Sequence, residues 1–249
     1  MNKNSPDQQT NLDAEKQLAA AAVLDWVRAG MTVGLGTGST AAHFITQLGE
    51  RVRNGLQIQA TATSKASEDL ARRVGIPLLE PRRGLRFDLT VDGADELDPS
   101  LRLIKGGGGA LLREKVLATA SDYLLIIADS SKAVAQLGRF PLPLEVVPFA
   151  LPWVLDAVDA LGGAPVVRVG QTAGTLAHSD QGNLLVDCHF KQLADPEGLA
   201  QQLQTIPGVV EHGLFLGLAR AAVVATGGQV LVHRAGAAPT AASLFSALP

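Results

Sequence analysis

The sequence predicts an α/β fold, with a mostly parallel sheet in one domain and a smaller α+β second domain. Strand and helix signals alternate from the first helix to about residue 128, which is typical of a parallel sheet covered by helices. The pattern changes after Phe140, where PLPLEVVP contains three prolines. With 249 residues, 47% of them hydrophobic, the chain can bury the core of one or two such domains.

Short apolar strands and amphipathic helices follow one another in the first part of the chain. Gly30 is placed to end the first helix as its C-terminal cap, and GTGST forms a turn between a strand and the next helix. The predicted helices cover residues 12–29, 41–48, 66–74 and 110–120. The predicted strands cover residues 31–35, 58–62, 76–79, 87–91, 103–104 and 124–128.

The smaller domain is predicted from the change in pattern after Phe140. It contains helices over residues 152–161 and 196–204 and strands over residues 166–169 and 184–190. The last strands, 209–215, 222–225 and 229–233, are expected to return to the first sheet. The predicted organisation is a disordered tail (1–10), a catalytic sheet domain (11–138 and 208–249) and a small α+β domain (139–207).

Composition argues against several classes of protein. The net charge is −3, from 21 basic and 24 acidic residues without a basic block, which disfavours nucleic-acid and membrane-surface partners. Cys188 is the only cysteine, so no internal disulfide can form, as in proteins of a reducing compartment. The polar start MNKNSPDQQT lacks the apolar core of a signal peptide, and no run approaches a membrane helix. We expect a cytoplasmic protein.

The segment GLGTGST predicts an anion site. A strand, a glycine-rich turn and a helix start leave backbone N–H groups free for a phosphate, and Thr37, Ser39 and Thr40 add hydroxyl groups. The spacing lacks the full dinucleotide fingerprint, so a phosphate monoester fits better. The alternative is an ordinary turn capped by Ser39. Lys16, on the apolar stripe of the first helix, either reaches this phosphate or extends to water.

Two aspartates follow the strand predicted over residues 87–91. Asp92 and Asp95 lie at its carboxyl end, where open α/β sheets bind ligands, and Gly93 lets the chain turn between them. Taken alone, they can equally be turn-forming aspartates. Lys105, arriving after the next strand, changes this balance because a run of four glycines follows it.

The glycine run indicates a place where backbone approaches a ligand closely. Four glycines are entropically costly to order, and a flexible linker is disfavoured because strand and helix patterns flank them tightly. Lys105 supplies a positive charge beside these amides, suited to stabilising a developing oxyanion.

Glu114 is the strongest candidate for a general base. Its helical neighbours at three and four positions are apolar, so its carboxylate faces inward instead of to water. Burial raises the pKa of such a group towards neutrality unless Lys105 lies close enough to oppose it. A surface glutamate between Arg113 and Lys115 is the alternative that this periodicity disfavours.

The remaining polar residues give weaker signals. Lys132, in IADSSK, offers a further phosphate or hydroxyl contact, with a solvated lysine as the equal alternative. The five histidines and single cysteine show no metal-ligand spacing, so neither a metal nor another cofactor is predicted.

Several of these segments together resemble type A ribose-5-phosphate isomerases. They are GLGTGSTAAHFI, VDGADELD, LIKGGGGALLREK, IADSSK and FPLPLEVVP. The similarity runs from the first helix to about Phe215, and its DGADE and KGGGGALLREK motifs are highly specific. It implies a Rossmann-like domain with a small lid-like domain. The implied reaction interconverts D-ribose 5-phosphate and D-ribulose 5-phosphate without a metal, in the non-oxidative pentose phosphate pathway.

The resemblance also assigns residues. Glu114 becomes the proton acceptor in a reaction through an enediolate, with Asp92, Asp95 and Lys105 completing the catalytic set. The implied substrate-binding residues are Lys16, Thr37, Gly38, Ser39, Thr40, Asp92, Gly93, Ala94, Asp95, Lys105, Gly106, Gly107, Gly108 and Lys132. The implied partner is a small-molecule sugar phosphate, and the implied assembly is a homodimer or a tetramer.

The chain departs from the family pattern in two places. Ala221-Ala222 stand where an Ala-Asp pair is frequent, and GAAPTAASLFSALP extends past the usual end. Neither departure touches the proposed site.

Two other classes of protein fit part of the pattern. Coenzyme A transferases have a related sheet and use a glutamate as covalent nucleophile, which hydroxylamine would trap as an acyl adduct. A non-catalytic sugar-phosphate sensor would keep the phosphate turn but needs no inward glutamate. It would usually carry an output domain, and no helix-turn-helix signal accompanies this chain.

Overall fold

The computed structural model describes residues 6–170 and 172–241, which form three sheets. The largest has seven strands in the order β14-β13-β12-β6-β3-β1-β2, and the neighbours from β2 to β12 are parallel. Its strands are β1 (Thr32–Leu35), β2 (Gln59–Ala62), β3 (Leu89–Asp92), β6 (Leu124–Asp129), β12 (Ala219–Thr226), β13 (Gln229–His233) and β14 (Thr240–Ala241). The predicted mostly parallel sheet is confirmed.

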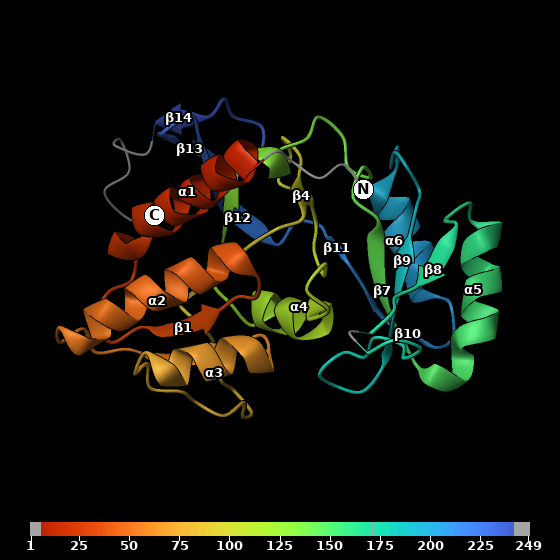
Figure 1. Cartoon of the computed structure of the whole chain (residues 1–249), viewed down its shortest axis with the longest axis horizontal. Helices are drawn as coiled ribbons and strands as arrows, with labels where there is room; N and C mark the ends of the chain where they lie inside the picture. Colours follow the sequence, from red (N-terminus) through yellow and green to blue (C-terminus); the bar gives the residue numbers. More distant parts are fainter. Residues whose placement is uncertain (1–5, 171, 242–249) are drawn as a thin grey trace.

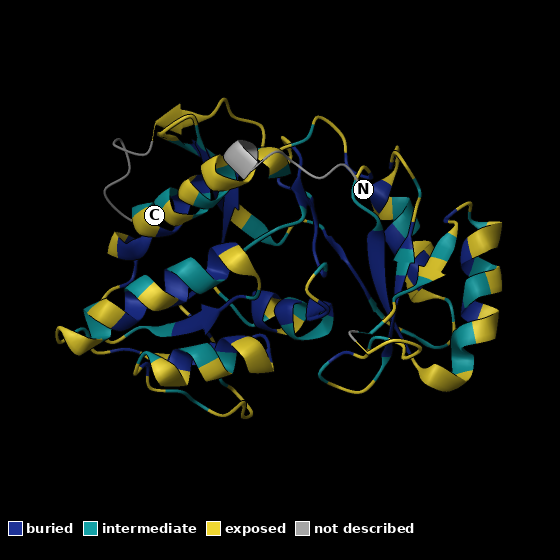
Figure 2. Cartoon of the chain, viewed as in Figure 1, coloured by how far each residue is buried: buried dark blue, intermediate teal, exposed yellow. Residues whose placement is uncertain are grey.

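Helices cover this sheet because successive strand residues point to opposite faces. Leu125 and Ile127 pack under one helical layer, whereas Ile126 and Ala128 pack on the other face with α4. Figure 1 shows α1, α2 and α3 arranged one below another, with α4 beside them. The helices are α1 (Pro6–Ala22), η1 (Leu24–Trp26), α2 (Ser39–Arg53), α3 (Lys65–Arg73), α4 (Leu111–Thr119) and η2 (Ser130–Lys132). The strands between the layers are buried (Figure 2).

A second, four-stranded sheet of order β10-β7-β9-β8 forms the other part of the molecule, at the right of Figure 1. Leu144, Val186, Val158 and Leu203 belong to the core between this sheet and its helices. The elements are β7 (Leu142–Val146), η3 (Pro148–Ala150), α5 (Leu151–Ala160), β8 (Pro165–Val167), β9 (Leu184–Cys188), α6 (Pro196–Gln204) and β10 (Val209–His212). This α+β unit agrees with the smaller second domain that the sequence predicts.

A short three-stranded sheet lies between these parts and positions the candidate site. Its antiparallel order is β11 (Leu214–Phe215), β5 (Leu103–Ile104) and β4 (Glu96–Leu97). Asp95 comes directly before β4, and Lys105 comes directly after β5. Because β4 and β5 pair, these two residues are held close together although nine residues separate them.

The N-terminal helix differs from its prediction at both ends. α1 ends at Ala22, and the predicted continuation to residue 29 is a short 3₁₀ turn instead. α1 begins at Pro6, so residues 6–10 of the predicted disordered tail are helical; residues 1–5 lie outside the described part. Proline suits a first helical position, where its missing N–H costs nothing and its φ is already helical.

Two predicted strands are also corrected. Within residues 76–79 only Leu78 bridges to Ala60, since Pro77 cannot donate to a ladder. Residues 209–215 do not join the seven-stranded sheet. They divide at Gly213 into β10, in the four-stranded sheet, and β11, in the three-stranded sheet. A Cβ at Gly213 would lie 2.3 Å from the carbonyl oxygen of Lys105, so only glycine permits this crossing.

No helix in the described part of the chain is long and apolar enough to cross a membrane.

Candidate active site

The glycines of GLGTGST make room for side chains of the neighbouring strand. β1 and β3 pair in parallel, and a Cβ at Gly34 would lie 1.9 Å from Thr90 Oγ1. A Cβ at Gly36 would lie 2.1 Å from Oδ1 of Asp92. Without these Cβ atoms, the Asp92 carboxylate lies against the turn and accepts hydrogen bonds from the N–H of Thr37 (3.0 Å) and its neighbour Gly93 (2.7 Å).

Three charged side chains are buried together behind this turn. Lys105, Asp92 and Glu114 are 2%, 1% and 4% exposed. Lys105 Nζ lies 2.9 Å from Asp92 Oδ2 and 3.4 Å from Glu114 Oε1, and it donates to the carbonyl oxygen of Gly93 at 2.6 Å. A buried lysine that meets two carboxylates compensates only part of their charge.

The pKa of Glu114 is raised to about 8. Burial is the main cause, and the Asp92 carboxylate adds to it, while the Lys105 ammonium opposes it. Burial also opposes the charge on Lys105, but the carboxylates of Asp92 and Glu114 outweigh this and raise the pKa of the lysine. A protonatable carboxylate thus lies beside an ammonium group that keeps its proton. The inward orientation predicted for Glu114 is confirmed.

The glycine run forms a tight loop between β5 and α4. Gly106 and Gly109 have φ values of +104° and +79°, which favour glycine. The N–H of Gly107 donates to Asp95 Oδ2 at 2.7 Å, so the loop and the second aspartate hold one another. A Cβ at Gly107 would lie 2.6 Å from Asp95 Oδ1. The close backbone approach predicted from the glycine run occurs here against a protein carboxylate.

Glu114, Lys105 and Asp95 meet at a cavity of about 90 Å³, whereas Asp92 and Gly107, although predicted to bind substrate, do not line it. The N-terminus of α2 faces it, and its N-cap, Gly38, has no side-chain cap, so the alternative of a turn capped by Ser39 is wrong. The Thr37 hydroxyl is engaged within the protein, donating to Ser64 Oγ at 2.8 Å. The lining residues are Thr37, Gly38, Ser39, Thr40, Gly93, Ala94, Asp95, Lys105, Gly106, Gly108, Glu114 and Lys132.

Lys16 is not among the residues that line this cavity. It is half-buried on α1, whereas its neighbour Glu15 is buried. Glu15 accepts hydrogen bonds from the N–H and hydroxyl of Ser130 (3.0 and 2.7 Å) and from the N–H of Gly227 (3.0 Å). α1 therefore supports the turn that carries Lys132 into the lining.

Two further residues contact the site from distant parts of the sequence. Phe215 of β11 presents its ring to two ammonium groups, 5.4 Å from Lys105 Nζ and 4.9 Å from Lys115 Nζ. Arg168, which follows β8, donates to carbonyl oxygens of the glycine loop. Neither residue stands in a motif, so the sequence offers no local signal for its role.

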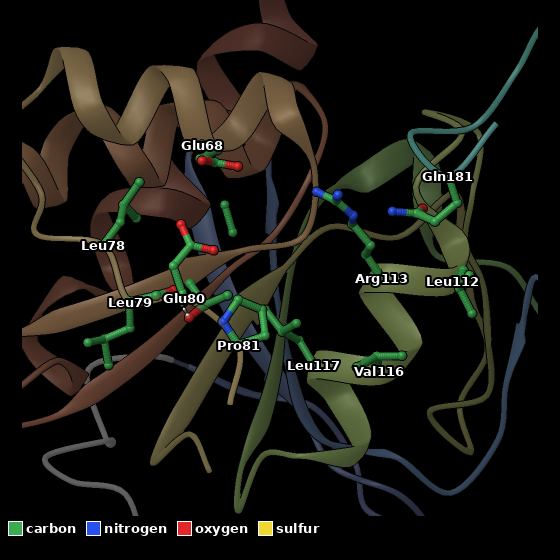
Figure 3. A pocket seen from close by; sticks show the side chains of 12 residues that line it. Glu68, Leu78, Leu79, Glu80, Pro81, Leu112, Arg113, Val116, Leu117 and Gln181 are labelled. Carbon is green, nitrogen blue, oxygen red and sulfur yellow. Dashed lines mark hydrogen bonds between the residues drawn. The ribbon is translucent and has the colours of Figure 1, made fainter. Parts of the chain in front are cut away.

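A second cavity of about 360 Å³ lies on the other face of α4 (Figure 3). Arg113 and Gln181 extend into it from one side, and Glu80 lies across from them. It is larger than the first cavity, but the buried set of Lys105, Asp92 and Glu114 does not line it. Within residues 6–170 and 172–241, no three His, Cys, Asp or Glu side chains are grouped to hold a metal ion.

Comparisons with known proteins agree with this arrangement. Residues 59–229 match the family model of ribose 5-phosphate isomerase A (phosphoriboisomerase A). A ribose-5-phosphate isomerase A of Sphingopyxis alaskensis is 50% identical over 229 residues, covering 92% of this chain and all of the relative. One of Nitrobacter hamburgensis is 53% identical over 220 residues, covering 86% and 94%.

Solved structures show the same fold. Ribose 5-phosphate isomerase A of Methanocaldococcus jannaschii superposes with a TM-score of 0.85 at 36% identity, covering 89% of this chain and 99% of that one. A D-ribose-5-phosphate isomerase in complex with phospho-erythronic acid gives a TM-score of 0.87 at 34% identity, covering 90% and 99%. The predicted two-domain α/β fold is confirmed. By sequence and by fold, the chain belongs to the ribose 5-phosphate isomerase A family of isomerases.

Proposed function

We propose that this protein interconverts D-ribose 5-phosphate and D-ribulose 5-phosphate by proton transfer at Glu114. One observation carries the mechanism: Oε2 of Glu114 is buried without a hydrogen-bond partner among the described residues, while Oε1 lies 3.4 Å from the Lys105 ammonium. A carboxylate with one free oxygen and a raised pKa is suited to accept a proton from carbon. The family match supports the choice of substrate.

The phosphate end of the substrate is assigned to the N-terminus of α2. The backbone N–H groups that begin this 15-residue helix have no side-chain cap, and the helix dipole favours an anion there. Ser39, Thr40 and Lys132 also line the cavity. We retain Lys16 as a proposed phosphate ligand only through the family resemblance, because its side chain lies outside the lining.

The geometry suggests different roles for the two aspartates. Both oxygens of Asp92 are engaged, one by the N–H groups of Thr37 and Gly93 and the other by Lys105. Asp95 is only half-buried and lines the cavity. We therefore assign proton exchange during ring opening to Asp95 and the orientation of Lys105 to Asp92.

The isomerisation then runs through an enediolate. Glu114 accepts the C2 proton of the open-chain aldose, and the electron pair forms the C1–C2 double bond as O1 becomes negative. Lys105 and the backbone N–H of Gly108, both in the cavity lining, stabilise this charge. A proton passes from O2 to O1 and Glu114 returns its proton to C1, which leaves a ketone at C2 and an alcohol at C1.

Domain boundaries, assembly and location are part of the same proposal. The small domain extends to include β10, because that strand pairs with β7. Phe149 and Trp153 are 83% and 62% exposed next to one another on the small domain, which supports association as a homodimer. The single buried cysteine, Cys188, supports a reducing, cytoplasmic location.

The test is conversion of ribose 5-phosphate in D₂O with EDTA present. Turnover with deuterium entering C1 of the ribulose 5-phosphate is expected, because a carboxylate that carries the proton exchanges it with solvent. Absence of turnover, or complete retention of the substrate hydrogen, would contradict the proposal. An acyl-glutamate trapped by hydroxylamine in the presence of acyl-coenzyme A would favour the transferase class instead.

A further inference from the structure

Arg168 extends from the four-stranded sheet to the glycine loop of the site. Its Nη1 donates to the carbonyl oxygens of Gly107 (3.1 Å) and Gly106 (3.3 Å). The rest of its guanidinium is held by Asp187, with Nε 3.0 Å from Oδ2 and Nη2 2.5 Å from Oδ1. The two side chains are 20% and 21% exposed. Asp187 thus fixes the plane of the Arg168 guanidinium, and the remaining nitrogen of that group, Nη1, reaches the glycine loop of the site.

The carbonyl orientations determine where the loop N–H groups point. The C=O and N–H of one trans peptide are antiparallel, and the described chain contains no cis peptide. The peptide joining Gly106 to Gly107 turns its carbonyl to Arg168 and its N–H to Asp95. The next peptide turns its carbonyl to Arg168 as well, so the N–H of Gly108 points away from the arginine. Gly108 lines the cavity, and its N–H donates to no group among the described residues.

A glycine loop needs such an external contact to keep one orientation. Without Cβ atoms these peptides rotate at little steric cost, and ordering them is entropically unfavourable. The loop also packs against the small domain, since a Cβ at Gly109 would lie 2.9 Å from Leu185 Cδ1. Arg168 also fixes which way the two peptides face. Its positive charge beside their carbonyl oxygens makes the N–H groups on the opposite side stronger hydrogen-bond donors.

We propose that Arg168, held by Asp187, is a positioning residue for the isomerisation. It orients the loop so that the N–H of Gly107 holds Asp95 and the N–H of Gly108 faces the oxygen that becomes negative. The inference rests on the proposed isomerase function and gives the small domain a part in it. This domain then supports the catalytic loop from one side, besides any covering of the substrate.

The test compares Arg168→Met and Arg168→Lys with Arg86→Met. Arg86 is the control because it forms an exposed ion pair with Asp122, outside the cavity lining. We expect Arg168→Met to lower kcat by up to about 100-fold, as misplaced catalytic groups do, with a much smaller change in KM. Arg168→Lys will not restore kcat, because an ammonium group lacks the fork that binds Asp187 twice and still reaches the loop.

A second readout does not depend on activity. Hydrogen–deuterium exchange of the amides in residues 106–109 should be faster in Arg168→Met than in the wild type and in Arg86→Met. If Arg168→Met does not fold, Asp187→Asn takes its place, with the same faster exchange and a partial loss of kcat.

The outcomes separate the two proposals. A folded Arg168→Met with wild-type kcat, or full restoration by lysine, would refute the positioning role while leaving the isomerase function intact. A wild-type protein without turnover would refute the function, and unchanged exchange at the loop would then refute the positioning role as well.

Discussion

Oε1 of Glu114 lies 3.4 Å from Nζ of Lys105, whereas Oε2 of the same carboxylate has no hydrogen-bond partner in the described structure. The two oxygens thus have different roles. The first is oriented by a cation, and the second is free to accept a proton. Burial raises the pKa of Glu114 to about 8, and Lys105 opposes this only in part because it also pairs with Asp92 at 2.9 Å.

Replacing Glu114 by glutamine should remove turnover and leave substrate binding in place. The amide keeps the size of the side chain but cannot accept the C2 proton, so we expect kcat to fall by at least about 10²–10⁴-fold. Calorimetric titration with ribose 5-phosphate should give a Kd close to that of the wild type. Glu197→Gln, at a half-exposed position on α6, is the matched control. Normal kcat with weakened binding would show that Glu114 is a ligand and not the base.

The pH dependence of kcat/KM should show the raised pKa of Glu114. The base works only when ionised, so kcat/KM should rise with pH and level off above about 8. Lys105→Met should move this acidic limb to higher pH in the residual activity, because the ammonium group lowers the pKa of the carboxyl. Steady-state rates from pH 5 to pH 10 give the acidic limb of the wild type and that of Lys105→Met. A wild-type limb near the ordinary value of 4.5 would contradict the assignment.

Glu114 should also make the protein less stable as the pH rises. The folded-state pKa lies above the ordinary 4.5, so the folded protein holds a proton that the unfolded chain releases. The resulting stability is fully present below about pH 4.5 and is lost as the pH rises to about 8. Glu114→Gln lacks this loss, so its Tm should exceed that of the wild type at pH 9 and approach it at pH 4.5. An equal difference in Tm at both pH values would contradict the raised pKa.

Much of the fold could be predicted from local patterns. The helix over residues 196–204 and the strand over residues 103–104 were predicted at their observed bounds because Pro196 and the glycine run mark their ends sharply. β7 could not be predicted in the same way. Its Pro143 argues against an interior strand, yet the strand lies between β9 and β10. Pairing with strands far along the chain outweighs this local signal.

In the candidate site too, local patterns predict some residues, whereas others depend on contacts between distant segments. The inward orientation of Glu114 follows from the apolar periodicity of a single helix, so the sequence is sufficient. The apolar stripe of the first helix predicts that Lys16 faces the site, but its neighbour Glu15 is the buried charged residue of α1. Arg168 comes from a different sheet, and no local pattern connects it to Gly107. Contacts between domains depend on tertiary packing, which periodicity within one element does not report.

Gly36 should tolerate no side chain, for a reason unrelated to phosphate binding. Its Cβ would lie 2.1 Å from Oδ1 and 2.5 Å from Cα of Asp92, so Gly36→Ala must displace β3 or its carboxylate. Overpacking of this kind costs about 1–3 kcal/mol or more of the free energy of unfolding. Displacing Asp92 also frees Lys105 from its stronger partner, so kcat should fall together with stability. Gly49→Ala is the control, because its Cβ would lie 2.5 Å from Val74 Cβ, outside the cavity lining, so it should lose stability and keep kcat. Urea unfolding and steady-state rates of both variants test this, and an unchanged kcat in Gly36→Ala would show that the turn yields instead of Asp92.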